Sequence, residues 1–282
     1  MWTLGRVGFQ ANPVLLRQEI GRRVRAAREA AGLNLTDAAL RLEIARSSVS
    51  RLENGLTMMS VHLARSMMDI YDFYDEDLLN LVRFARERGW WRQYGFSDKH
   101  FVAVESGAAK LSSFEPELVP GLLQTADYAR ALFSASGLRR SAEWIDKQLE
   151  VRMIRQERLV DDEQPLKLAV VIGENALRRP VGDAEVMRAQ LRHLVLITEL
   201  PTVSLRVLPA SVITDDATYG AFFILDFPYG PSMVHLEHIL GSERTDKPDL
   251  VSSAKLRLDR MRSLALGSAE SCAMIEWVAD NL

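Results

Sequence analysis

The stretch from Leu35 to Gly55, LTDAALRLEIARSSVSRLENG, decides the fold of the first part of the chain. Apolar residues at helical spacing predict one short helix through Leu42 and another from about Arg46 to Asn54. Gly55 can end the second helix in the left-handed conformation that glycine adopts readily. The connection from Glu43 to Ala45 is so short that the two helices must cross sharply, which predicts a helix-turn-helix.

The second of these helices has two chemically different faces. Val49 and Leu52 lie three residues apart and are expected to face the core together with Ile44. The opposite side carries, in order, Arg46, Ser47, Ser50 and Arg51. Small side chains let a helix approach base edges closely, and an arginine can donate two parallel hydrogen bonds to guanine. The pattern favours a helix in the DNA major groove, with a solvated face in an all-helical protein–protein module as the alternative.

The chain around this pair predicts three further helices, at about 14–31, 60–71 and 75–88. Asn34, Ser60 and Asp75 are suited to cap the N-termini of the second, fourth and fifth helices. Charge supports the same division, because residues 1–56 hold nine arginines and five acidic residues while the whole chain has a net charge of −3. We therefore predict a basic, all-α, five-helix DNA-binding bundle over residues 1–88, with a salt-sensitive attraction to phosphates.

The rest of the chain has a different pattern. Strands are expected at 166–172, 203–209, 221–227 and 232–239. Helices are expected at about 98–112, 121–136, 141–160, 183–198, 248–265 and 268–281. The turn signal PYGP between the last two strands predicts a hairpin. Residues 89–282 thus predict a larger mixed α/β domain, and the chain as a whole belongs to the α+β class.

Composition excludes several classes of function. The single cysteine, Cys272, rules out an internal disulfide and a cysteine-based zinc site. No uncharged apolar run reaches about 18 residues, and the N-terminus lacks the layout of a signal peptide, so we expect a cytoplasmic protein without a membrane partner. No phosphate-binding loop, nucleophile elbow or HExxH motif is present, so we expect no catalytic residues, no enzyme activity and no cofactor.

The spacing of the histidines does not predict a metal site. His235 and His238 are three residues apart on an expected strand, so they point to opposite faces. His235 and Glu237 share a face, but two ligands without a third are too few.

The segment from Leu35 to Gly55 resembles XRE/Cro-type helix-turn-helix regulators, the group of the phage repressors, and its ending SxSRLENG is the most specific part. The resemblance implies that three side chains face the bases, namely Arg46, Ser47 and Arg51. It implies that three others lie near phosphates, namely Asn34, Ser50 and Asn54. It also implies a structural ion pair between Arg28 and Glu53, whose loss would unfold the head at a cost of about 3–5 kcal/mol.

Three positions depart from the pattern of these regulators. Leu35 replaces a glutamine that touches the DNA backbone. Glu43 stands where the turn glycine is usual and must tolerate an unusual backbone conformation at a cost of order 1 kcal/mol. Ala45 replaces the usual Ser or Thr cap of the third helix, which typically costs about 1 kcal/mol. None of the three points to another activity.

Later segments are similar to a large group of actinobacterial regulators with a C-terminal domain of undefined function, called Scr1-type or antitoxin-like. The segments are ERGWW, EPELVPGLLQTADYARAL, RMIRQERL, GENALRRPVG and MRAQLRHL. The resemblance implies a transcription factor that is often encoded beside a very small partner protein. It leaves an alternative open, in which the chain is an antitoxin-like module that captures the small protein and DNA binding is autoregulatory.

Four residues beyond the head are candidates for a ligand or partner site. Glu174 follows an expected strand, where α/β folds often bind ligands, and Arg178 could receive an anion. The alternative is that Glu174 caps a helix and Arg178 is solvated. Trp90 and Trp91 could stack on a ligand, or they could pack the join between the domains. From the pattern of such regulators we expect a homodimer on double-stranded DNA, with half-sites about 34 Å apart, and an unknown small-molecule effector.

Overall fold

The computed structural model describes residues 12–98, 100–135, 137 and 140–282. The first eleven residues of the domain expected over 1–88 therefore lie outside the described residues, as do residues 99 and 136 of two expected helices. The chain forms two compact units. One runs to Gly107 and includes Pro228–Gly230, and the other comprises Ala108–Phe227 and Pro231–Leu282. The domain boundary after residue 88 stays a prediction.

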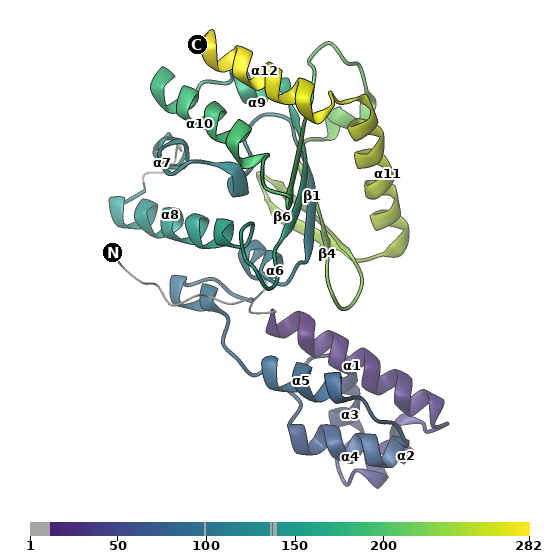
Figure 1. Ribbon diagram of the computed structural model, residues 1–282. Helices are drawn as coiled ribbons and strands as arrows, with labels where there is room; N and C mark the ends of the chain where they lie inside the picture. Colours follow the sequence, from purple (N-terminus) through teal and green to yellow (C-terminus); the bar gives the residue numbers. More distant parts are fainter. Residues whose placement is uncertain (1–11, 99, 136, 138–139) are drawn as a thin grey trace. The chain divides into compact units, whose positions relative to one another are not determined.

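The first unit is a helical bundle (Figure 1). Its elements are α1 (Pro13–Ala30), α2 (Leu35–Arg41), α3 (Arg46–Glu53), α4 (Val61–Tyr71), α5 (Glu76–Phe84), a 3₁₀ turn η1 (Trp90–Tyr94) and α6 (Phe101–Glu105). The predicted caps are confirmed, since side-chain oxygens of Asn34, Ser60 and Asp75 accept main-chain hydrogen bonds at the starts of α2, α4 and α5. The core is built mainly from apolar side chains of α1, α3, α4 and α5.

Two glycines let α1 and α3 approach through their backbones. A Cβ atom on Gly21 of α1 would lie 2.4 Å from the carbonyl oxygen of Glu53. Gly55 adopts the predicted left-handed conformation, with φ of +66°, and a Cβ there would lie 2.8 Å from the backbone of Gln18. Because both of these neighbours are main-chain atoms, no side-chain movement could make room for a Cβ atom. The close contact between the end of α3 and α1 therefore requires glycine at both positions.

The second unit is built on a six-stranded mixed sheet in the order β3-β2-β1-β4-β5-β6. The strands are β1 (Lys110–Glu115), β2 (Lys167–Gly173), β3 (Val203–Leu208), β4 (Phe222–Asp226), β5 (Met233–His238) and β6 (Gly241–Thr245). β1, β2 and β3 are parallel, whereas β4 runs antiparallel to β1 and continues into an antiparallel β4-β5-β6 ribbon. The predicted hairpin is confirmed, with Phe222 opposite Leu236.

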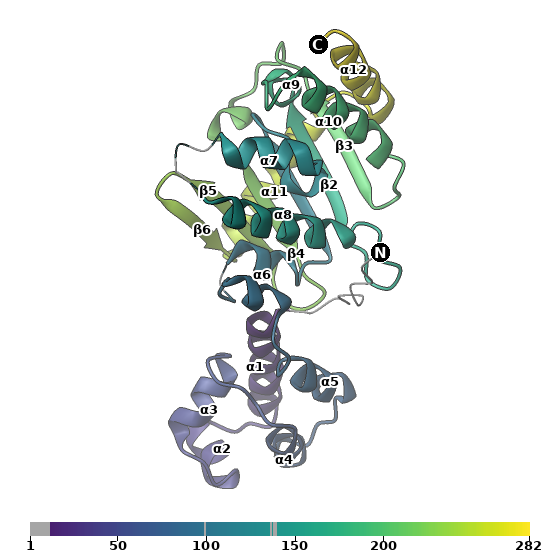
Figure 2. The same ribbon diagram turned by 90° about the vertical axis from the view of Figure 1, so that its left-hand side faces the viewer.

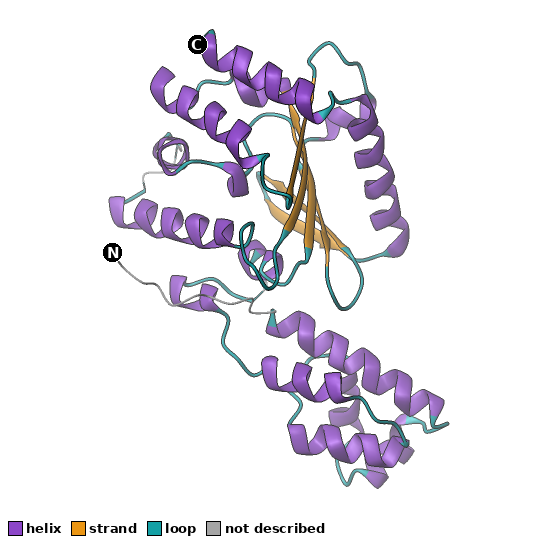
Figure 3. Ribbon diagram, viewed as in Figure 1, coloured by secondary structure: helices purple, strands orange, loops and turns teal. Residues whose placement is uncertain are grey.

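Helices cover both faces of this sheet (Figures 1 and 3). The helical elements are η2 (Gly121–Leu123), α7 (Ala126–Ser134), α8 (Ala142–Glu157), α9 (Glu174–Arg178), α10 (Ala184–Ile197), η3 (Asp215–Tyr219), α11 (Pro248–Leu264) and α12 (Ser268–Asp280). In Figure 1, α11 lies along one face, and α7, α8 and α10 lie on the other side. The start of α12 contacts the edge strand β3, where Ser271 accepts a hydrogen bond from the N–H of Val207. Under α11, Leu258 and Met261 pack against Phe114, Val171 and Ile224 of the sheet.

Several element predictions were wrong. The helix expected over 98–112 is only the short α6, because the chain turns at Ser106 and then enters β1, the strand between β2 and β4. The helix expected over 121–136 is divided into η2 and α7 by Thr125, whose hydroxyl caps α7. The fifth helix ends at Phe84 rather than near residue 88. β6 was not predicted, because its polar sequence GSERT becomes a strand only by pairing with β5.

Candidate nucleic-acid interface

α3 presents the face that the sequence predicted. Val49 is fully buried and Leu52 nearly so, and both belong to the core of the bundle. Ile44, just before the helix, packs against the same core. The remaining side of α3 carries the candidate base-contacting residues, and Arg46, Ser47 and Arg51 are all exposed in the first unit. The helix therefore has an anchored apolar side and an outward side of cations and hydroxyls.

The turn between α2 and α3 has the strain expected from the sequence. Glu43 has a φ of 54°, a left-handed conformation that non-glycine residues rarely adopt. Two hydrogen bonds hold the turn, from the N–H of Glu43 to the Leu40 carbonyl at 3.3 Å and from Ile44 to Ala39 at 3.1 Å. Ala45 is the N-cap of α3, and its methyl group cannot accept a hydrogen bond.

The candidate phosphate-contacting residues lie at helix ends. The Asn34 side-chain oxygen accepts from the N–H groups of Thr36 and Asp37 at 2.8 and 3.0 Å, which forms a capping box at the start of α2. At the end of α3, the Asn54 side-chain amide donates to the Ser50 carbonyl at 2.7 Å. Both asparagines are exposed, and Ser50 is half-buried. Their contacts with phosphate stay predictions.

Arg28 and Glu53 form a buried ion pair between α1 and α3. The Arg28 Nε and Nη2 atoms donate to the two Glu53 carboxylate oxygens at 2.6 and 2.8 Å. Its Nη1 donates to the Leu33 carbonyl at 2.7 Å, in the α1–α2 connection. Arg28 is 6% exposed and Glu53 is 7% exposed. A single guanidinium thus joins three segments of the helix-turn-helix.

A second charged network holds α5 to α1. Glu19 is buried and accepts hydrogen bonds from Arg22 and Arg23, at 2.8 Å each. Arg23 also donates to Asp75 at 2.9 Å, the residue that caps α5. Burial alone would raise the pKa of Glu19, but hydrogen bonds from the two arginines outweigh it and lower this pKa.

The tryptophan candidates differ in burial. Trp91 is fully buried, and its indole N–H donates to the Asp98 carboxylate at 3.1 Å. Asp98 also accepts from Arg92, which together with the indole lowers the pKa of Asp98. Trp90 is half-buried and meets Trp91 and Tyr94 edge to face. This geometry favours packing within the first unit over the stacking of a ligand on Trp91.

Glu174 and Arg178 contact each other on α9 in the second unit. Glu174 accepts from the N–H of Ala210 at 2.9 Å and from Arg178 at 2.7 Å. These two hydrogen bonds lower the pKa of Glu174. Arg178 also lies over the Trp277 ring, 5.4 Å from its centroid. The contacts favour the structural alternative, because both side chains already have protein partners.

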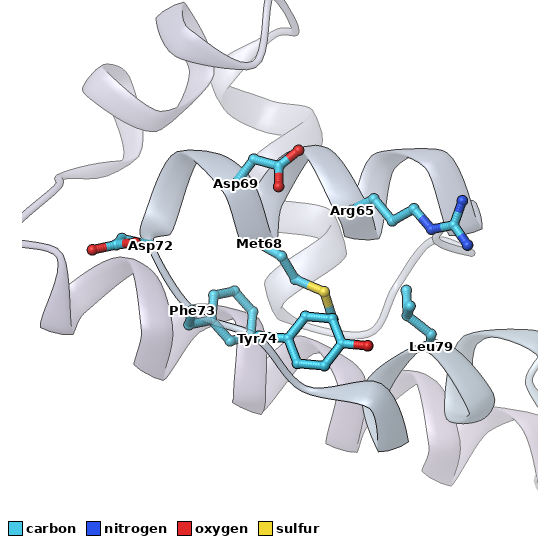
Figure 4. A pocket seen from close by; sticks show the side chains of 7 residues that line it. All are labelled: Arg65, Met68, Asp69, Asp72, Phe73, Tyr74 and Leu79. Atoms are coloured by element: carbon cyan, nitrogen blue, oxygen red, sulfur yellow. The ribbon is translucent and has the colours of Figure 1, made fainter.

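An open groove in the first unit was not predicted from the sequence. It has a volume of about 690 Å³ and lies between α4 and α5. Figure 4 shows Arg65, Asp69 and Asp72 along α4, with Tyr74 at the connection to α5. Tyr74 is 77% exposed. In Figure 2, α5 and α3 lie on opposite sides of α1, so the α5 wall of the groove is not on the α3 side of the bundle.

Other kinds of site receive no support in the described part of the chain. No group of three or more His, Cys, Asp or Glu side chains there is arranged to hold a metal ion. His235 and Glu237 share a face of β5, as predicted, with 3.3 Å between Nε2 and Oε1. Within the same residues, none of the helices combines the length and apolar composition needed to span a bilayer.

Family comparisons match both units. A helix-turn-helix domain matches residues 19–82, which span most of α1 through α5. A domain of unknown function, DUF5753, matches residues 98–277. No curated protein and no solved structure matches the chain. The second match covers more than half of the chain, so the protein belongs to the DUF5753 family and carries a helix-turn-helix domain ahead of that region.

Proposed function

We propose that the protein is a sequence-specific DNA-binding transcriptional regulator of the XRE type, in which α3 binds in the major groove. The observation that carries the proposal is the two-sided character of α3. Its apolar side is buried in the bundle, while Arg46, Ser47 and Arg51 are exposed along the other side. A helix of this kind, within a helix-turn-helix, is suited to read base edges.

We further propose how the protein assembles on DNA and which part of it is regulatory. The protein acts as a homodimer on two half-sites about 34 Å apart, or a multiple of that distance. Asn34, Ser50 and Asn54 contact phosphates near the ends of α2 and α3. The second unit senses a small molecule or docks a partner. Support for the regulatory role is the fusion of a helix-turn-helix domain to a larger α/β unit of the DUF5753 family.

The experiment is selection of bound DNA from a random pool, followed by affinity measurements on the selected site. We expect Arg46→Ala and Arg51→Ala each to lose about 1–3 kcal/mol of binding free energy and to relax specificity. Arg83→Ala is the matched control, since Arg83 is an exposed arginine of α5, away from α3. A pool without any enriched motif, or folded Arg46 and Arg51 variants that bind like the control, would contradict the proposal.

A further inference from the structure

A small polar cavity lies in the second unit, between α11 and the parallel strands. Its volume is about 40 Å³. The polar side chains that line it come from three segments, namely Lys110 and Ser112 of β1, Ser204 of β3, and Asp259 and Arg262 of α11. Ala169 of β2 contributes a small methyl group to the wall. The cavity contrasts with the apolar core that α11 forms with other parts of the sheet.

The two serines occupy positions on the face of the sheet that packs against α11, where apolar side chains are expected. Ser112 is two residues from Phe114, so both point to the face that α11 covers. Ser112 is only 6% exposed. Ala169 is directly opposite Ser112 on β2 and Ser204 is opposite Ala169 on β3, so the two hydroxyls flank one small side chain. Burying a hydroxyl costs free energy unless it has a hydrogen-bond partner.

Cations dominate the surroundings of these hydroxyls. The Arg262 Nη2 atom is 3.2 Å from the Ser204 hydroxyl, which places the guanidinium beside the sheet. Lys110 lies on the same face as Ser112, two residues earlier, and directly opposite Asp226 of β4. Asp259 is the one acidic side chain in the described lining, and it is exposed to solvent. The lining therefore has two cations and two hydroxyls against one carboxylate, and Lys110 is exposed to solvent as Asp259 is.

Arg206 supplies an independent observation. It is two residues after Ser204 on β3, so it shares the face that α11 covers. Its Nη1 atom donates to the Arg262 carbonyl at 3.2 Å. Its Nε atom is buried and has no hydrogen-bond partner among the described residues. A buried N–H without a partner is unfavourable, so one donor of Arg206 is left unsatisfied on the face that α11 covers.

We propose that this cavity binds one small tetrahedral oxyanion of the size of phosphate or sulfate. A single water needs about 10–15 Å³ of such space, so the cavity has room for a few water-sized oxygens and not for a nucleotide. The Ser112 and Ser204 hydroxyls donate to the anion, and Arg262 donates through N–H groups that Ser204 does not use. Lys110 supplies the second positive charge. The bound anion connects α11 to β1 and β3.

The test uses the full chain and inorganic phosphate as the probe. Calorimetric titration at constant ionic strength is expected to show saturable binding of one phosphate per chain. Sulfate should compete with it, whereas acetate, a carboxylate without tetrahedral geometry, should not. Phosphate should also raise the unfolding temperature in a saturable manner, beyond the general effect of such salts on protein stability.

Variants decide whether the binding belongs to this cavity. Ser112→Ala and Arg262→Gln are each expected to weaken phosphate binding at least tenfold. Arg192→Gln, a change at an exposed arginine of α10, should bind like the wild type. Ser112→Ala keeps the test decisive if Arg262→Gln fails to fold. The absence of saturable phosphate binding, or equal binding by Ser112→Ala and the wild type, would overturn the proposal, and neither result depends on DNA.

Discussion

Replacing Arg28 by methionine tests how strongly the buried ion pair holds the helix-turn-helix together. Methionine matches much of the length of arginine but has no charge and no hydrogen-bond donor. The Glu53 carboxylate, 7% exposed, would lose both donors at 2.6 and 2.8 Å, and the Leu33 carbonyl would lose its own at 2.7 Å. Breaking a buried pair in this way costs about 3–5 kcal/mol.

That loss is large for a bundle of this size. At about 0.05–0.15 kcal/mol per residue, the stretch from α1 to α5 has a free energy of unfolding of roughly 4–11 kcal/mol. Arg28→Met is therefore expected to unfold the bundle or bring it close to unfolding at 25 °C. Hydrogen exchange measured on peptides from α1 and α3 reports this unit separately from the second one.

Two companion variants test whether the loss of stability comes from the unpaired Glu53 carboxylate. Arg25→Met removes an exposed pair with Glu29 on the same helix and should change exchange very little. The double variant Arg28→Met with Glu53→Leu removes both buried charges and should recover much of the lost protection, because no carboxylate is left unpaired. If Arg28→Met exchanges like Arg25→Met, the ion pair does not hold the bundle and the reasoning is refuted.

Three further predictions concern backbone, pH and capping. Gly55→Ala should lower the free energy of unfolding of the first unit by more than 1 kcal/mol in urea titrations, because the methyl group meets the Gln18 backbone at a left-handed φ. Burial and the nearby Glu237 raise the pKa of Glu115 from 4.5 to about 8, so the folded unit favours the protonated carboxyl and loses stability as pH rises from 4.5 to 8. Glu115→Gln should therefore be more stable than the wild type at pH 9, by up to about 5 kcal/mol, and similar to it at pH 4.5. An equal pH dependence of the two proteins would contradict this prediction. Ala45→Ser should stabilise the first unit by about 0.5–1 kcal/mol by capping α3, and no shift in the urea midpoint would show that the cap does not form.

The first unit was predicted well because its elements are encoded locally. Ser60 and Asp75 start α4 and α5 where their side chains cap main-chain N–H groups, and Gly55 turns the chain after α3. The strained Glu43 was identified because a glycine is usual at that position of similar proteins. The outward side of α3 followed from helical periodicity alone, since Val49 and Leu52 fix the inward side.

The second unit was harder to predict because its pairing is not local. β1 pairs with β2 and β4, more than 50 and 100 residues later in the chain, and its sequence KLSSFE has no strong strand pattern. β6 is polar and lies at the edge of the sheet, so periodicity carries no signal for it. The oxyanion cavity could not be found from the sequence either, because Ser112, Ser204 and Arg262 come together only in the folded sheet.

The close backbone contacts at Gly21 and Gly55 have a consequence for how such a protein diversifies. They fix the position of α3 through main-chain atoms, and none of the outward side chains takes part in them. Exchanging Arg46, Ser47 or Arg51 therefore leaves the scaffold intact. Under the proposed function, a lineage can then acquire new operator preferences by a few point changes while the rest of the bundle stays as it is.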